Sequence, residues 1–224
     1  NAPENEILKT KIIKEISLYA KKNTIIASSS SGLLPTKIQA KCINPKRVII
    51  AHPFNPVYLL PLVELVPGEK TDLKIISKAK NFYRNIGMKT LVLKKELPGY
   101  LSDRLQESMW RESLHIINEG HASTQDLDDA IIYGPGLRWS LMGTFLTFHL
   151  AGGEMGMKHM LEQFGPALKL PWTKLKAPIL TESLKNKIIN GTKNQSKNKS
   201  INSLANSRDN FLIDLQNLLK KYKI

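Results

Sequence analysis

The sequence of 224 residues contains one cysteine, Cys42, so it has no internal disulfide. A lone cysteine favours a reducing compartment, and the absence of a nearby ligand pattern indicates that Cys42 is a packed thiol. No apolar run approaches the length of a membrane span, which predicts a soluble protein. The first residues, NAPENEILK, lack the basic start and apolar core of a signal peptide. We therefore expect a cytoplasmic protein without a membrane partner.

Acidic residues are few relative to basic ones, with 19 Asp and Glu against 33 Lys and Arg, and the net charge is +14. Residues 185–224 carry nine Lys or Arg and two Asp, about half of this excess. Such a balance is typical of proteins that bind nucleic acid or anionic surfaces. Here the lysines are scattered among asparagines, without interleaved aromatic residues or a nucleic-acid motif. We interpret them as solvated surface and expect no nucleic-acid partner.

The chain also contains no GxGxxG sequence, the glycine-rich loop that usually opens a dinucleotide-binding sheet. It begins instead with a predicted helix and shows too few strand signals for a complete doubly wound sheet. We therefore expect that the front half of the first domain is missing from this chain, through truncation or gene splitting.

What is present is an alternation of strand and helix signals up to residue 96, followed by helical signals alone. Strands are predicted at 24–28, 47–52, 61–66 and 88–93, and helices at 4–22, 33–41 and 71–86. After Leu97-Pro98-Gly99, helices are predicted at 100–119, 124–133, 140–150, 154–164, 179–190 and 208–222, with an irregular segment at 165–178. The predicted fold is a partial Rossmann-type α/β domain over 1–96 and an all-α domain over 97–224. The low-complexity stretch 191–200 predicts partial disorder in its basic tail.

The most informative segment is AHPFNPVYLLPLVELVP, residues 51–67. His52 ends one apolar run, and Glu64 lies inside the next. A buried acid needs a partner, and two strands joined by the intervening loop would bring Glu64 to His52. A carboxylate behind an imidazole fixes the tautomer of the histidine and raises its basicity, as a general base requires. The competing interpretation is that His52 is an ordinary hydrogen-bonded histidine at the end of a strand.

Several motifs together resemble the 3-hydroxyacyl-CoA dehydrogenase superfamily. They are SSSSGL at 28–33, HPFNP at 52–56, Glu64 and PGYLSDR at 98–104, and they occur in the order of that family. The stretch GPGLRWSLMGTFLTFHLAGGEMGMKHMLEQFGPALKLPWTKL, 134–175, resembles its carnitine-oxidising branch.

The resemblance implies an NAD-dependent oxidation of a 3-hydroxyl group. It assigns His52 as the catalytic histidine, Glu64 as its orienting acid, and Ser31 as a serine near both the substrate oxygen and the cofactor. Asn55 matches an asparagine on the nicotinamide side, and Glu4 and Lys9 match cofactor contacts, although both also fit an exposed helix face. Asp103 is a further candidate substrate contact that departs from the family pattern, because acyl-CoA members usually carry asparagine at this position.

The substrate implied by the resemblance is small, either L-carnitine or a 3-hydroxyacyl compound. A trimethylammonium group cannot donate hydrogen bonds and favours aromatic faces. Trp139, Phe145 and Phe148 are therefore candidate substrate contacts, although core packing is the simpler explanation of these aromatic residues. No metal-ligand spacing is found among the histidines. The family resemblance also implies a homodimer through the helical domain, in which helix 100–119 supplies the interface.

Three functions thus remain open from the sequence. The first is a carnitine dehydrogenase chain, and the second is a 3-hydroxybutyryl-CoA or other 3-hydroxyacyl-CoA dehydrogenase. The third is a non-catalytic remnant or assembly partner, because the chain contains no phosphate-binding glycine loop.

Overall fold

The computed structural model describes residues 2–175, 181–219 and 221, and it divides into two compact units, Asn1–Met109 and Trp110–Ile224. In the first unit the elements are α1 (Glu6–Tyr19), β1 (Ile26–Ser28), α2 (Pro35–Gln39), β2 (Val48–Pro53), β3 (Leu62–Pro67), α3 (Leu73–Asn85) and β4 (Lys89–Val92), with a 3-10 turn at Pro45–Arg47. The four predicted strands are confirmed, each within two residues of its predicted ends.

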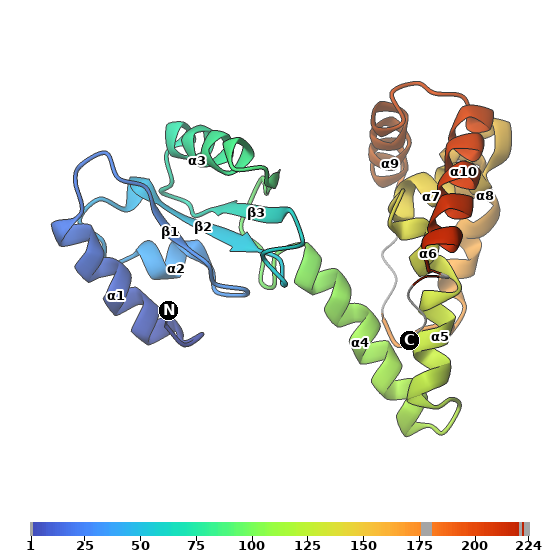
Figure 1. Cartoon of the computed structure of the whole chain (residues 1–224), viewed down its shortest axis with the longest axis horizontal. Coiled ribbons are helices and arrows are strands. Elements are labelled where there is room, and N and C mark those ends of the chain that lie inside the picture. Colours follow the sequence, from blue (N-terminus) through green and yellow to red (C-terminus); the bar gives the residue numbers. More distant parts are fainter. Residues whose placement is uncertain (1, 176–180, 220, 222–224) are drawn as a thin grey trace. The chain divides into compact units, whose positions relative to one another are not determined.

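The first unit is a four-stranded mixed sheet in the order β1-β2-β3-β4 (Figure 1). β1 runs parallel to β2, β2 antiparallel to β3, and β3 parallel to β4. Because successive side chains of a strand point to opposite faces, β2 and β3 each contribute to two cores. One face packs on α3 through Ile49, Ala51, Val63, Leu65 and Ala79, and the other packs on α2 through Ile38, Ile50, Val66, Leu93 and Tyr100. The α/β prediction for this part is thereby confirmed.

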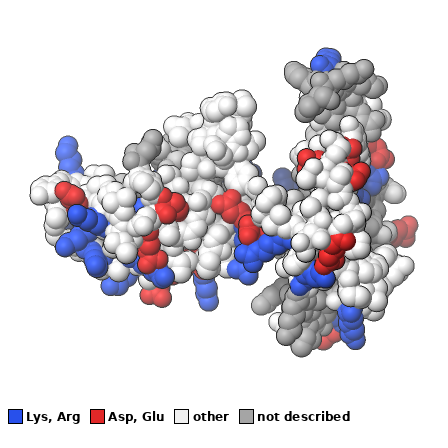
Figure 2. Space-filling model, turned by 90° about the horizontal axis from the view of Figure 1, so that it is seen from below, with Lys and Arg blue, Asp and Glu red and all other residues white. Residues whose placement is uncertain are grey.

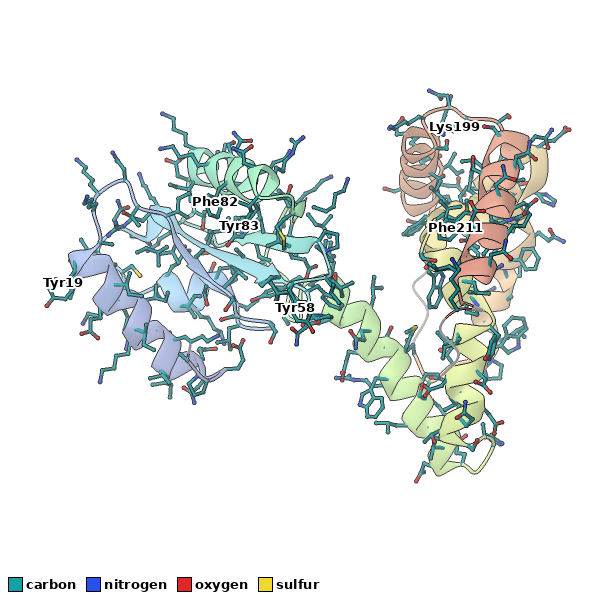
Figure 3. The ribbon with its side chains drawn as sticks, viewed as in Figure 1. Tyr19, Tyr58, Phe82, Tyr83, Lys199 and Phe211 are labelled. Carbon is teal, nitrogen blue, oxygen red and sulfur yellow. The ribbon has the colours of Figure 1, made fainter. Side chains whose placement is uncertain are left out.

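Two aromatic neighbours show how α3 lies on the sheet. Tyr83 packs against the core of the α3 face, whereas Phe82 next to it is 57% exposed (Figure 3). Their rings meet edge to face with centroids 5.2 Å apart. Asp72 begins the helix, because its side chain accepts a hydrogen bond from the Lys74 N–H, 2.7 Å away.

The remaining elements are helical in the described part of the chain. They are α4 (Ser102–Asn118), α5 (Thr124–Ile132), α6 (Pro135–Trp139), α7 (Thr144–Ala151), α8 (Met157–Phe164), α9 (Glu182–Gln195) and α10 (Ile201–Leu219), with 3-10 turns at Gly153–Met155 and Gly165–Lys169. Met142, Leu150 and Leu204 form the buried core of the second unit. The two units divide inside α4, because the first turn of this helix is hydrogen-bonded to the sheet.

Over 191–200 the structure describes α9 through residue 195 and a turn that leads into α10, and the partial disorder of this tail stays a prediction. Thr192 and Ser196 are buried, and their hydroxyls donate to the carbonyls of Ile189 and Lys193. These two hydroxyls are therefore buried with hydrogen-bond partners. The amino-acid composition of the segment does not reveal such pairing. Parts of the predictions at 165–178, 179–190 and 208–222 fall on residues 176–180, 220 and 222, outside the described residues.

Charged side chains of both signs are interspersed on the face drawn in Figure 2. None of the described helices is long and apolar enough to cross a membrane. Within the same residues, no three His, Cys, Asp or Glu side chains form a metal-binding group.

Candidate active site

The register of β2 and β3 places His52 directly opposite Glu64. Their side chains therefore share one face of the sheet, and His52 Nδ1 lies 3.0 Å from Glu64 Oε2. Glu64 is fully buried and His52 is 7% exposed. The partnership expected from the sequence is thus present in the structure.

The buried Glu64 carboxylate has three hydrogen-bond donors. Besides His52, the N–H groups of Leu101 and Ser102 donate to Oε1 over 3.0 and 3.1 Å. Burial alone raises the pKa of a carboxyl group, but these donors outweigh it and hold the pKa of Glu64 below its usual value. Glu64 is therefore ionised at neutral pH.

The charge on Glu64 determines the tautomer of His52. An ionised carboxylate only accepts hydrogen bonds, so the proton of the neutral imidazole is on Nδ1. The lone pair is then on Nε2, the nitrogen that faces away from Glu64. This is the arrangement that a general base needs.

A tight turn just before α4 orients the N–H groups of Leu101 and Ser102 toward Glu64. Gly99 and Tyr100 both have positive φ, 71° and 45°, a conformation that costs a residue with a side chain some strain. Tyr100 is fully buried, its hydroxyl donates to the Leu33 carbonyl over 2.7 Å, and its ring centroid lies 5.5 Å from that of His52. Burial, reinforced by the nearby carboxylates, raises the pKa of Tyr100 far above its usual value, so the hydroxyl stays a donor. These contacts hold the turn in place.

The serine loop, residues 28–32, leaves the sheet at the carboxyl end of β1, where open α/β sheets bind ligands. Glu4 holds this loop by accepting from the Ser31 N–H over 3.0 Å. Lys9 pairs with Glu4 and also donates to Ser30 Oγ, 2.9 Å away. Lys9 is 8% exposed, so it is not the solvent-facing helix residue that its sequence position suggested. Glu4 and Lys9 therefore stabilise the conformation of the serine loop.

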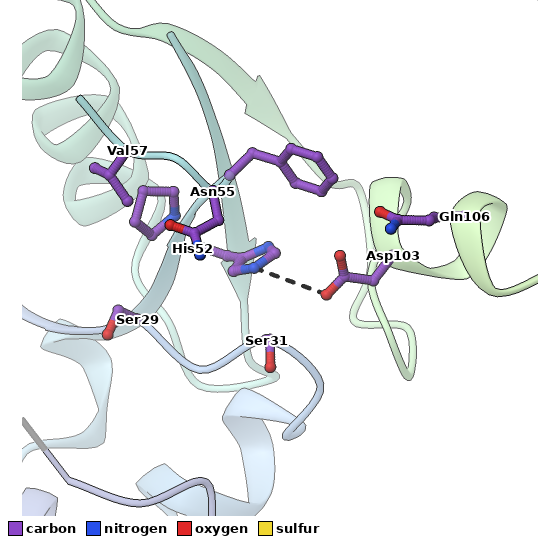
Figure 4. Close-up of a pocket in the computed structure, with 9 residues that line it drawn as sticks. Ser29, Ser31, His52, Asn55, Val57, Asp103 and Gln106 are labelled. Carbon is purple, nitrogen blue, oxygen red and sulfur yellow. Dashed lines mark ion pairs between the residues drawn. The ribbon is translucent and has the colours of Figure 1, made fainter. Parts of the chain in front are cut away.

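A cavity of about 490 Å³ opens beside His52 (Figure 4). Its lining comes from the serine loop, from the end of β2 with the turn that follows, and from the first turns of α4: Ser29, Ser31, His52, Pro53, Phe54, Asn55, Val57, Asp103 and Gln106. Asp103 points toward His52, with Oδ2 3.8 Å from Nε2. The structure thus brings together His52, Ser31, Asn55 and Asp103 of the predicted site residues, with Glu64 behind the histidine.

Comparisons with known proteins agree with this architecture. Residues 1–97 match the family model "3-hydroxyacyl-CoA dehydrogenase, NAD binding domain", and residues 99–197 match "3-hydroxyacyl-CoA dehydrogenase, C-terminal domain". The chain is 56% identical over 222 residues to L-carnitine dehydrogenase of Bacillus cereus, an alignment that covers 99% of this chain and 68% of that relative. The chain belongs to the 3-hydroxyacyl-CoA dehydrogenase family. L-carnitine dehydrogenase of Oceanobacillus iheyensis is 52% identical over 222 residues, with 99% and 72% coverage.

A solved 3-hydroxyacyl-CoA dehydrogenase, from Archaeoglobus fulgidus, has the same fold as this member of the family. The TM-score is 0.72 at 23% identity, with 98% of this chain and 75% of that one covered. The α/β part followed by an all-helical part is therefore the family architecture.

The cavity of this 3-hydroxyacyl-CoA dehydrogenase family member also includes residues that were not predicted from the sequence. Gln106 lies one helical turn after Asp103 on α4, a spacing that signals a shared face, and Ser29 lies in the same loop as Ser31. Trp139, Phe145 and Phe148 belong to the second unit and are 37%, 53% and 44% exposed. Their role as substrate contacts stays a prediction.

The described residues fit one end of NAD. Ser31 and Asn55 bring a hydroxyl and an amide to the cavity beside His52, which suits the uncharged carboxamide of a nicotinamide ring. Among the described residues that line the cavity there is no Lys or Arg to meet a pyrophosphate. The described lining thus fits the nicotinamide end of NAD.

Proposed function

We propose that this protein oxidises the 3-hydroxyl group of L-carnitine to a ketone, giving 3-dehydrocarnitine. The observation that carries the proposal is the His52–Glu64 pair at a cavity whose described lining contains one carboxylate, Asp103, and no Lys or Arg. The Asp103 carboxylate suits the quaternary ammonium group of L-carnitine, whereas the 3-hydroxyacyl part of a CoA ester carries no cation for it to meet. The name of the similar Bacillus cereus and Oceanobacillus iheyensis proteins, L-carnitine dehydrogenase, agrees with it.

In this mechanism His52 is the general base. Its Nε2 accepts the proton of the substrate 3-hydroxyl as the carbon–oxygen double bond forms, and the imidazole becomes an imidazolium. Glu64, ionised and 3.0 Å from Nδ1, stabilises the charge that develops on the ring. Because Glu64 is already held by backbone donors, it needs no rearrangement during the reaction.

Ser31 and Asn55 are assigned to positioning. Ser31 donates to the substrate oxygen, and Asn55 keeps the substrate and the nicotinamide in register. NAD, when bound, supplies the acceptor for the hydride that leaves the carbinol carbon. Glu4 and Lys9 are proposed to serve the cofactor side by fixing the serine loop.

The test is a direct assay of NADH formation by the full product of the gene. L-Carnitine and 3-hydroxybutyryl-CoA are supplied separately, and D-carnitine serves as the stereochemical control. We expect kcat/KM for L-carnitine to exceed that for the CoA ester by about a hundredfold or more, as a site matched in charge to one substrate allows. A preference for the CoA ester would replace carnitine as the substrate, and no turnover with either would favour the non-catalytic alternative.

A second copy of the chain is the proposed partner. Helix α4 has no buried residue, and Leu105, Trp110 and Leu114 along it are 70%, 59% and 48% exposed. Exposed apolar side chains on one helix are typical of a surface that another protein covers. Light scattering is expected to give the mass of two copies, and Trp110→Glu to lower it toward one. A single-copy mass for the unaltered protein would reject the homodimer.

A further inference from the structure

The gap between His52 and Asp103 has an unusual chemical character, because both groups that face it are hydrogen-bond acceptors. Glu64 fixes the proton of His52 on Nδ1, so Nε2 presents a lone pair. Asp103 presents Oδ2 at 3.8 Å from that nitrogen. Two acceptors cannot bond to each other, and the distance exceeds that of a hydrogen bond. The pair therefore favours a molecule that brings a donor to one group and positive charge to the other.

The separation of the two acceptors restricts what that molecule is. When a substrate hydroxyl donates to Nε2, a positive centre near Asp103 has to lie close to the hydroxyl oxygen. In a 2-hydroxyalkyl ammonium compound three bonds join the oxygen to the nitrogen, so in staggered conformations the two atoms are about 3–4 Å apart. A molecule with so short a span can donate its hydroxyl to Nε2 while its cation lies beside Oδ2, because these two acceptors are only 3.8 Å apart.

Asp103 is the residue of the described cavity lining that can attract a positive charge. The cavity lining that the structure describes holds no second carboxylate, and Ser29, Ser31, Asn55 and Gln106 are uncharged. The side chain of Asp103 is 34% exposed, so its charge is only partly screened by solvent. Asp103 also lies in the first turn of α4, where a carboxylate stabilises the helix by interacting with its dipole. That structural role is the alternative that a test has to separate.

We infer that Asp103 is the residue that selects a substrate whose quaternary ammonium group is one methylene away from the carbinol carbon, and that it does so by charge. This inference rests on the proposed function and specifies how the same site recognises its substrate. Asp103 recognises the positive charge of the substrate, whereas His52 accepts the proton of its hydroxyl group. The expected substrate class is the 2-hydroxyalkyl ammonium compounds, of which L-carnitine is one.

The experiment compares L-carnitine with its uncharged carbon isostere, in which a tert-butyl group replaces the trimethylammonium group. The unaltered protein is expected to prefer L-carnitine in kcat/KM, and Asp103→Asn to reduce this preference by about tenfold or more, mainly through the KM of L-carnitine. Asp103→Glu retains the charge and should retain most of the preference. Glu69→Gln, which removes an exposed carboxylate that does not line the cavity, is the matched control and should leave the preference unchanged.

The outcomes separate this inference from the proposed function and from a merely structural role. Suppose that the unaltered protein turns over L-carnitine and that Asp103→Asn lowers kcat equally for L-carnitine and its tert-butyl isostere. Asp103 then does not recognise the charge of the substrate, and the inference is wrong. A change in melting temperature alone, with the preference intact, would likewise leave only the helix-stabilising role. If the unaltered protein does not oxidise L-carnitine, the proposed function itself fails.

Discussion

His52→Gln is expected to lower kcat for L-carnitine oxidation by about a thousandfold, the scale of a lost general base. Glutamine fills a similar space, but its amide nitrogen is a donor and has no lone pair to accept the hydroxyl proton. Binding of NAD should change little, because the base acts on the substrate hydroxyl. The measurements are steady-state kinetics with L-carnitine and calorimetric titration of the protein with NAD.

The control for this variant is His121→Gln. His121 is an exposed histidine of the second unit whose ring pairs at 3.5 Å with Glu119, so it tests the same substitution away from the cavity. We expect unchanged kinetics for it. If His52→Gln retained more than a tenth of the activity, proton transfer would have to be assigned to another group.

Glu64→Gln is expected to affect both activity and stability. The amide cannot stabilise the imidazolium and no longer dictates the tautomer of His52, so kcat should fall by about a hundredfold or more. The free energy of unfolding should fall by about 1–3 kcal/mol, because charge-assisted hydrogen bonds from His52 and two backbone amides are weakened in a fully buried place. Urea unfolding measures the second effect, and Glu69→Gln is again the matched control.

The stability effect of Glu64→Gln should depend on pH in one direction. The pKa of Glu64 is lowered in the folded protein, so the folded state favours the ionised form more than the unfolded state does. The stabilisation is complete above the unfolded-state pKa of about 4.3 and is lost as the pH falls through the lower folded-state value. The difference between the unaltered protein and the variant should therefore be constant near neutral pH and shrink below about pH 4. A difference that grew toward acid pH would contradict this assignment.

The His52–Glu64 pair was predictable from the sequence because local features decide it. Two short apolar runs, 47–52 and 61–66, are joined by a short connection and predict neighbouring strands, and the observed register places His52 opposite Glu64. The acid in an apolar strand was itself the signal, since it required a buried partner. The strands at 24–28 and 88–93 were likewise predicted from short strand-like segments.

Other features depended on contacts between distant segments and were not predictable. The serine run alone does not distinguish Ser30, which is fully buried beside Lys9, from Ser31, which lines the cavity and was selected only through the family resemblance. The backbone donors of Leu101 and Ser102 reach Glu64 only because of the turn at Gly99 and Tyr100. The separation of Asp103 from His52 likewise follows from where α4 begins. Such positions are set by tertiary packing, which residue patterns do not encode locally.

The three donors on Glu64 join two tasks in a single carboxyl group. One oxygen orients the imidazole, and the other secures the first turn of α4 to the sheet. A fluctuation that lifts this turn would strip the carboxylate of its amide partners, weaken its hold on the ring and carry Asp103 away from the histidine. Local detachment of the first turn of α4 and the loss of His52 as an oriented base would then occur together. We therefore expect this enzyme to abstract the proton only while the turn is attached to the sheet.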